Sequence, residues 1–507
     1  MKTAGLDIGT TGCKCTVFDE NGRYLDKAYR DYPVRRRITG HEIDMQVLTE
    51  SVLECIEEMA GKYPDIAGIG VTSFGETFVL TYEEGRPLHT AMLYTDPRGS
   101  GECRRLVEKL TEERIAAITG MRPHEMYGIS KMMWLRDNEP GMYSQAKHVF
   151  QVEDLIVYIL SGKAQIDYSL ATRSMAFDIT TLKWSDEILD TAGIEKSLFP
   201  EAVPSGTPAG RIKKDMAEKL GLSQDTVIVS IGQDQIAAAA GAGAFDGSVA
   251  VDGAGTVECL TPIYDSRPDI EKMSRGYFAV VPYVVSGKYA AYAFSYTGGA
   301  LTRWCVDTIA GEEKKLAESL GISVNELLEK QYAKKMTELG LSPDEPSGLL
   351  VLPHFAGAAT PYMDTGSRGA ILGLTTDTGA CEIYRGCLEG VCYEMYVNYK
   401  ALSDTGIRFK KLHATGGGSK SAVWMQMKAD VLGLPITAMK TVDAGTVGCA
   451  MLTGIAAGQF KDLNEASAMI QPSVTYEPRA DMHEKYMEHF KRYERLYGAV
   501  RPLMQTV

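Results

Sequence analysis

The sequence predicts a layered α/β protein built from two domains. Its 507 residues exceed the size at which a single hydrophobic core stops growing. A strand–turn–strand pattern opens the chain, and a similar pattern returns at 248–260. Strand-like and helix-like segments alternate after the first pattern, as is typical of α/β domains. We therefore expect one domain over 1–246, a second over 247–507, and a cleft between them.

The N-terminal segments predict a three-stranded meander. Its strands are expected, in chain order, at 3–8, 13–18 and 23–25. Asn21 and Gly22 favour a type I′ turn between the second and third strands, because both central positions of that turn need positive φ. A helix over 45–60 and a short strand over 67–72 follow, so the meander continues into an alternating α/β layer.

Three later segments complete the predicted architecture. A strand that ends near Asp234 runs into a helix of very small residues over 235–241, which can approach its neighbours closely. Strand patterns at 248–252 and 257–260 enclose a Gly/Thr turn like that of the opening hairpin, and two facing hairpins can hold a polyphosphate. Charged residues with helical apolar spacing over 481–503 predict a terminal helix packed on the outside.

Composition narrows the class of protein. Hydrophobic residues make up 45% of the chain and charged residues 23%, as in ordinary globular proteins. The formal charge of −13 argues against a nucleic-acid partner, and we interpret Arg35, Arg36 and Arg37 as a solvated loop. The ten cysteines include no Cys-x-x-Cys pair and are interpreted as reduced core residues. No signal-peptide pattern follows Met1, and the uncharged run 236–245 is too short to span a bilayer, so we expect a cytoplasmic protein without a membrane partner.

Asp7 and the turn that follows it suit a magnesium nucleotide. An acidic residue at the end of an apolar strand is costly to bury unless it is paired, and the turn Gly9–Gly12 offers backbone N–H and hydroxyl donors to anionic oxygen. The alternative is that Asp7 only caps the turn. The segment is not a Walker P-loop, because the turn leads into another strand instead of a helix.

A second Gly-rich turn, Gly416–Ser419, follows a predicted strand and precedes an amphipathic helix closed by Gly433. Glycines at such a turn let a nucleotide base or a phosphate touch the backbone. The alternative is a purely structural strand-to-helix turn.

Together these segments resemble the FGGY family of carbohydrate kinases, in the family's order and over essentially the whole chain. They are 5–11 at the first phosphate loop, 131–138 and 369–389 at the two signatures, and 416–419 at the adenine-side loop. The resemblance implies two ribonuclease H-like domains of the actin/hexokinase type with a cleft between them. It also implies ATP-dependent phosphorylation, with Mg²⁺, of a hydroxyl of a small sugar or polyol. The chain looks like xylulose kinases, so a pentulose such as xylulose is favoured.

The resemblance implies roles for individual residues. Asp234 stands in a Gly-x-Asp segment ahead of the small-residue helix, where the family has its catalytic base, although Asp is also a favoured N-cap. Asp7 is the metal residue that the resemblance implies. The implied ATP-binding residues are Thr10, Thr11, Lys14, Gly255, Thr256, Gly299, Gly417, Gly418 and Ser421.

The sugar is expected near two loops of the first domain. Glu76, Asp96 and Arg98 suit a polyol, since carboxylates accept hydroxyl hydrogens and arginine donates to hydroxyl oxygens; Asp234 would contact the same substrate. The alternative for Asp96 and Arg98 is a mutual surface ion pair. The loop departs from the family's familiar patterns, because xylulose kinases usually carry Gln-Met-His there and glycerol kinases carry Arg where Gly75 stands.

Two other functions are considered. One is an ATP-switched, actin-like activator or interaction protein without sugar turnover; the other is a sugar-binding regulator derived from a kinase. Both would dispense with catalysis, whereas Asp7, Asp234 and three Gly-rich loops are retained. The sequence leaves the oligomeric state open, with a homodimer as one alternative.

Overall fold

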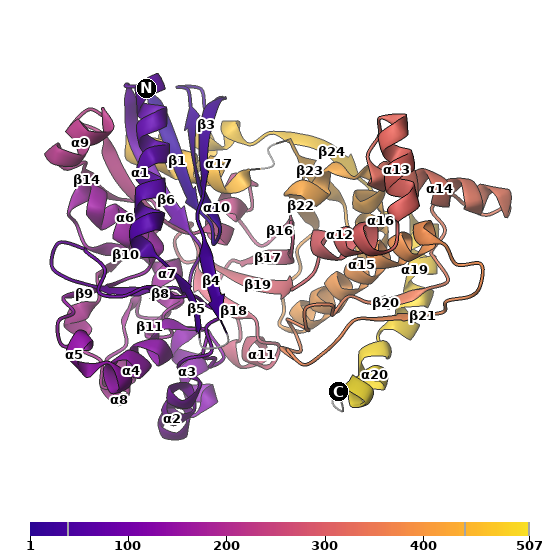
Figure 1. Cartoon of the computed structure of the whole chain (residues 1–507), viewed down its shortest axis with the longest axis horizontal. Helices are drawn as coiled ribbons and strands as arrows, with labels where there is room; N and C mark the ends of the chain where they lie inside the picture. The colour runs from indigo at the N-terminus through magenta and orange to yellow at the C-terminus, as the bar shows by residue number, and fades with distance from the viewer. Residues whose placement is uncertain (38–39, 441–442, 505–507) are drawn as a thin grey trace.

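Two mixed β-sheets, each flanked by helices, form the two halves of the molecule in Figure 1. The computed structural model describes residues 1–504 except 38–39 and 441–442. The six strands of the N-terminal sheet are, in spatial order, β14 (Thr207–Arg211), β15 (Val227–Gln233), β6 (Ile66–Ser73), β1 (Lys2–Ile8), β2 (Gly12–Phe18) and β3 (Tyr24–Asp31). The seven strands of the C-terminal sheet are β18 (Ala279–Pro282), β19 (Tyr289–Ser295), β17 (Glu258–Tyr264), β16 (Val249–Ala254), β22 (Lys411–Thr415), β23 (Ile436–Met439) and β24 (Pro472–Tyr476).

The two sheets share one pairing pattern. Strand β1 pairs antiparallel with β2 and parallel with β6, and β16 pairs antiparallel with β17 and parallel with β22. The next strands outward, β3 and β15 in one sheet and β19 and β23 in the other, continue this pattern. The predicted two-domain α/β fold is therefore confirmed. We keep 246/247 as the proposed boundary, because it lies between helix α10 (Asp234–Gly241) and β16.

The predicted type I′ turn between β2 and β3 is wrong. The connection runs over 19–23, and Gly22 has φ of 74° while Asn21 does not have positive φ. The Asp19 carboxylate accepts hydrogen bonds from the backbone N–H of Asn21 at 2.9 Å and of Arg23 at 2.8 Å. These bonds favour a longer loop in which only one residue is left-handed.

Helix α17 (Ala444–Ala456) packs on the N-terminal sheet although it follows the C-terminal sheet in the chain (Figure 1). It lies against β1, β6 and helix α10. A Cβ at Gly448 would overlap the carbonyl of Ala237, and one at Gly241 would overlap that of Ala444, so the two helices touch backbone to backbone. The close approach predicted for the small-residue helix is confirmed. Helix α1 (Met45–Lys62), predicted at 45–60, packs on β2 and β3.

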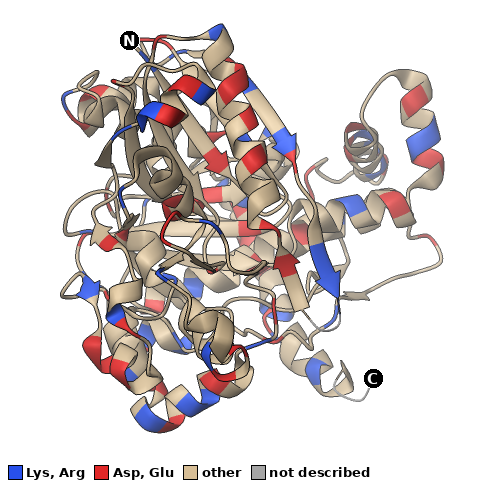
Figure 2. Ribbon diagram, turned by 60° about the vertical axis from the view of Figure 1, so that its left-hand side comes forward, with Lys and Arg blue, Asp and Glu red and all other residues tan. Residues whose placement is uncertain are grey.

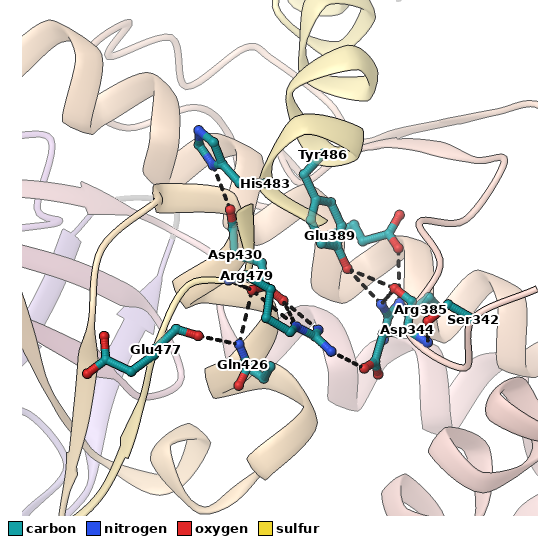
Figure 3. Close-up of polar contacts among 10 residues, drawn as sticks. All are labelled: Ser342, Asp344, Arg385, Glu389, Gln426, Asp430, Glu477, Arg479, His483 and Tyr486. Atoms are coloured by element: carbon teal, nitrogen blue, oxygen red, sulfur yellow. Dashed lines mark hydrogen bonds and ion pairs between the residues drawn. The ribbon is translucent and has the colours of Figure 1, made fainter. Parts of the chain in front are cut away.

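The predicted terminal helix is two helices, α19 (Ala480–Tyr493) and α20 (Leu496–Met504). Figure 3 shows how polar contacts fasten this region to helix α16 (Ala422–Leu432) and helix α15 (Ala380–Asp404). The Arg479 guanidinium lies 2.6 Å from Asp430 of α16 and 2.7 Å from Asp344. Arg385 of α15 donates to the Tyr486 hydroxyl of α19 at 2.7 Å. The C-terminal helix thereby holds α16 in place.

Several smaller expectations are also resolved. Arg35, Arg36 and Arg37 lie in strand β4 (Val34–Arg37) instead of a loop, and they are exposed as expected. Nine of the ten cysteines are buried, which confirms their core role; Cys381 is partly exposed. Acidic and basic residues are interspersed along the helices in the view of Figure 2. Within the described ranges, no helix is both long and apolar enough to cross a membrane.

Candidate active site

A cavity of about 1050 Å³ is lined by residues from both halves of the molecule. Three residues predicted for the site, Thr10, Glu76 and Asp234, lie in its wall. Much of the remaining wall is aromatic, including Tyr94 and Tyr292. A largely apolar cavity with a few convergent polar groups is the usual form of a small-molecule site. We call it the sugar-side cavity below.

Asp234 is the first residue of α10, and the N-cap is Gln233. The expected N-cap position is therefore wrong by one residue. The carboxylate accepts the backbone N–H of Gln235 at 2.7 Å and stands at the positive end of the helix. Burial raises the pKa of Asp234 to about 7; the nearby carboxylate of Asp7 adds to this effect, and the N–H of Gln235 opposes it. A carboxyl with such a pKa suits a proton acceptor at neutral pH.

Lys14 joins Asp7 to a residue that follows β23 in the chain. Its Nζ lies 3.0 Å from Asp7 Oδ2 and 2.6 Å from Asp443 Oδ1, at the start of α17. Burial raises the pKa of Asp7, while Lys14 opposes the change. Burial alone would lower the pKa of Lys14, but Asp7 and Asp443 outweigh it and raise that pKa. Asp443 carried no signal in the sequence that linked it to this group.

Glu76 and Arg173 form a buried ion pair in the wall of the sugar-side cavity. The guanidinium lies 5.3 Å from the ring centroid of Tyr127 and 5.4 Å from that of Tyr292. Glu76 has φ of 62°, which is unfavourable for a residue with a side chain, and its N–H donates to Gln151 at 3.1 Å. The surroundings thus hold Glu76 in a strained conformation that presents its carboxylate to Arg173. Sequence reasoning found Glu76 and missed Arg173.

The unusual glycine before Glu76 has a steric explanation. A Cβ at Gly75 would lie 3.2 Å from Cγ of Arg173 and 3.5 Å from Leu170. The stem of Arg173 therefore takes the space into which a larger side chain at position 75 would grow.

A second cavity, of about 1330 Å³, contains the predicted nucleotide-binding residues of the C-terminal half. The six that line it are Gly255, Thr256, Gly299, Gly417, Gly418 and Ser421. A Cβ at Gly299 would lie 2.8 Å from the carbonyl oxygen of Gly255, so this position has no room for a side chain and the two backbone segments pack closely. Val257, the next residue of the β16–β17 turn, lines the sugar-side cavity instead. The turn thus borders both cavities, and we call the second one the nucleotide-side cavity.

A buried charge cluster supports this turn. Nζ of Lys428 in α16 lies 2.7 Å from Asp252 of β16 and also pairs with Glu258 of β17. The same ammonium lies 4.6 Å from the ring centroid of Trp424, which lines the nucleotide-side cavity. The cluster ties both strands of the hairpin to the helix that follows the Gly-rich turn.

Five predicted residues line neither cavity: Asp7 and Lys14, described above, and Thr11, Asp96 and Arg98. Asp96 is buried and accepts hydrogen bonds from the backbone N–H of His41 at 2.7 Å and from Arg98 Nη2 at 2.7 Å. Arg98 also donates to Glu42 at 2.7 Å. The expected contact of Asp96 and Arg98 with the sugar gains no support from this arrangement; they form an ion pair, but Asp96 is buried instead of lying at the surface. Thr11 is exposed at the turn after β1.

Residues 3–241 match the N-terminal domain of the FGGY family of carbohydrate kinases, and residues 260–457 match its C-terminal domain. The chain belongs to the FGGY family of carbohydrate kinases. Members of this family are ATP-dependent phosphotransferases, so this FGGY kinase is an enzyme of carbohydrate metabolism, and the predicted family resemblance is confirmed.

Similar proteins act on different substrates. A glycerol kinase of Halorhodospira halophila is 30% identical, over 95% of this FGGY kinase and 93% of that relative. A xylulose kinase of Staphylococcus epidermidis is 25% identical, over 98% and 97% of the two chains. The crystal structure of a ligand-bound xylulose kinase from Lactobacillus acidophilus superimposes with a TM-score of 0.87 at 24% identity, over 99% of this chain and 98% of that one, which confirms the fold.

Proposed function

We propose that this FGGY kinase transfers the γ-phosphoryl group of ATP to a hydroxyl of a pentulose such as xylulose. One observation carries the proposal. The sugar-side cavity is lined by Asp234 and the Glu76–Arg173 pair, and the β16–β17 turn borders both this cavity and the nucleotide-side cavity. A phosphate held at that turn would face the hydroxyl beside Asp234.

The extent of the sugar-side cavity favours a substrate longer than a three-carbon polyol. The residues that line it reach from Thr10 and Asp234 to Arg122 and His124. Gly75 adds no side chain to the wall. A five-carbon ketose could contact Glu76 and Arg173 with some hydroxyls while presenting another to Asp234.

Each residue would have a distinct task. The Asp234 carboxylate accepts the proton of the attacking hydroxyl, and Glu76 and Arg173 orient the other hydroxyls by accepting and donating hydrogen bonds. Closure of the two domains around the bound sugar would exclude water, which limits loss of the phosphoryl group to hydrolysis. Positioning and charge neutralisation are the main demands of phosphoryl transfer.

The residues present fit ATP and Mg²⁺. Glycine backbone lines the nucleotide-side cavity, and Asp7 with Asp443 supplies carboxylate oxygens beside Lys14. Asp7 would be the protein's ligand to Mg²⁺, which prefers oxygen ligands. Bound MgATP would supply the phosphoryl group, and Lys14, Thr10 and Thr11 would neutralise or bind its phosphate oxygens.

A coupled ADP-release assay tests the proposal. Purified protein with ATP and Mg²⁺ is offered xylulose and other pentuloses, hexuloses, tetritols, glycerol and aldonates one at a time. We expect ADP release to depend on sugar, with the highest kcat/KM for a pentulose. ADP release at the same rate with and without every sugar would overturn the proposal and favour an ATP-switched interaction protein, for which we find no supporting observation. A cytoplasmic location and a homodimer stay predictions.

A further inference from the structure

A small cavity of about 320 Å³ lies behind the Glu76–Arg173 pair. Both residues line it and also line the sugar-side cavity, so the ion pair forms the partition between the two spaces. Most of the other lining is apolar, including Phe150 and Trp184. The centre of a water molecule can occupy about 20 Å³ of this space, which is enough for one water.

Asp154 is the ionisable residue that the mechanism leaves unused in this wall. It is the third residue of helix α6 (Val152–Ser161) and is fully buried. Neither of its carboxyl oxygens has a hydrogen-bond partner among the described residues. Burial raises the pKa of Asp154 well above its usual range, although nearby backbone amides of the first turn oppose this change.

Arg173, which lines the same cavity, has an unused donor. Its Nε and Nη2 are directed to Glu76, while Nη1 is buried and has no partner among the described residues. A buried donor or acceptor without a partner is costly, and both residues that carry these unpartnered atoms line the small cavity, so a ligand that serves both is favoured.

We propose that one buried water in this cavity links the Asp154 carboxyl to Nη1 of Arg173, which makes Asp154 a positioning residue for the sugar. The water accepts a hydrogen bond from Nη1 and donates to the Asp154 carboxyl, so both unpartnered groups gain a partner. Arg173 is then fixed on one side by Glu76 and on the other by the water. The effect on the sugar rests on the proposed function; the water link does not.

Glu153 provides a matched control. It precedes Asp154 in α6, is equally buried, and its carboxyl oxygens also have no hydrogen-bond partner within the described part of the chain. It lines neither the small cavity nor the sugar-side cavity. Loss of Glu153 therefore reports the general cost of altering a buried carboxyl on this helix, without the proposed link to Arg173.

The first experiment is a crystal structure of the whole protein at a resolution that shows ordered water. We expect a water within hydrogen-bond distance of both Asp154 and Nη1 of Arg173. A cavity with no ordered water, or a water that contacts only one of the two groups, would overturn the proposal. This measurement needs no substrate and no variant.

The second experiment compares Asp154→Leu, Asp154→Asn and Glu153→Leu, with xylulose and glycerol as probes. Asp154→Leu places methyl groups where the oxygens stand and should raise the KM of the sugar that is turned over about tenfold, with little change in the KM for ATP. Asp154→Asn keeps a polar atom at each of the two oxygen positions, including a carbonyl acceptor for the water, and should stay near the wild-type value. Glu153→Leu should leave the sugar KM unchanged.

The outcomes separate the two proposals. A sugar KM raised equally by Asp154→Leu and Glu153→Leu, or an Asp154→Asn variant as impaired as Asp154→Leu, refutes the positioning role. If neither sugar is turned over but the water contacts both groups, the proposed function fails and the water link stands. If Asp154→Leu does not fold, the crystal structure still tests the water link, and the kinetics of Asp154→Asn still test the positioning role.

Discussion

The acidity of Asp234 should determine how the rate depends on pH. Burial and the nearby Asp7 carboxylate raise the pKa of Asp234 to about 7. A general base must be ionised to accept the hydroxyl proton, so kcat/KM should rise with pH and level off above about pH 8. An aspartate with the ordinary pKa of about 3.9 would give a flat profile over the same range.

The size of this effect follows from the pKa. About half of the Asp234 carboxyl groups are ionised at pH 7, about 9% at pH 6 and about 1% at pH 5, so kcat/KM should fall about tenfold for each pH unit below 6. Asp7→Asn removes a negative neighbour and should move the inflection to lower pH, whatever it does to the overall rate.

The same pKa has an effect on stability. The folded pKa of Asp234 is raised above that of the unfolded chain, so folding binds a proton between about pH 4 and pH 7, and stability is lost as pH rises through that window. The loss has an upper limit of about 4 kcal/mol, and the side chain's opening onto the cavity reduces it. Asp234→Asn should therefore raise Tm at pH 8 and leave it almost unchanged near pH 4.

ADP release measured from pH 5 to 9, with both substrates below their KM, reports the pKa of the free enzyme. Circular dichroism at each pH checks that the protein stays folded. An inflection below about pH 5 would refute the assigned pKa. An Asp234→Asn variant that keeps most of the activity would refute the role as base.

Three further variants test other parts of the site. Glu76→Gln removes the charged partner of Arg173 and should raise the sugar KM at least about tenfold while leaving the KM for ATP unchanged; equal changes in both would argue against a role in sugar binding. Gly418→Ala crowds the wall of the nucleotide-side cavity and should weaken binding of a fluorescent ATP analogue about tenfold, whereas Gly311→Ala, in open space at the surface, should not; equal affinities would place the nucleotide elsewhere. Lys428→Met leaves two buried carboxylates without their cation and should cost about 3–5 kcal/mol in urea unfolding, and a loss below about 1 kcal/mol would contradict the anchoring role of the cluster.

The fold and the nucleotide-binding residues could be predicted from the sequence, because both depend on local constraints on the backbone. Gly299 and Gly418 stand where a Cβ would crowd neighbouring atoms. The need for glycine at these positions is therefore visible as a short sequence motif. The meander and the second hairpin were predictable for a related reason, because alternating apolar residues specify a strand with one or two buried faces. Six predicted residues consequently line one cavity.

The sugar side depended on long-range contacts that no local pattern encodes. Arg173 follows a short helix, 97 positions after Glu76, and only the packed fold brings the two together. Asp96 and Arg98 have side chains suited to a polyol, but they satisfy one another and Glu42 instead. The type of a side chain shows which hydrogen bonds it can make to a sugar. Whether it is available to make them depends on its partners in the folded protein, which the sequence does not show.

The position of α17 on the N-terminal sheet has a consequence for synthesis on the ribosome. Cys449 and Leu452 of this helix pack with Val229 and Ile231 of β15, so the first half of the chain lacks part of its core until almost the whole protein has been made. Contacts between such distant residues slow folding and leave apolar surface exposed in the meantime. A nascent chain that pauses before α17 would therefore depend on chaperones, and a fragment ending at residue 246 should aggregate.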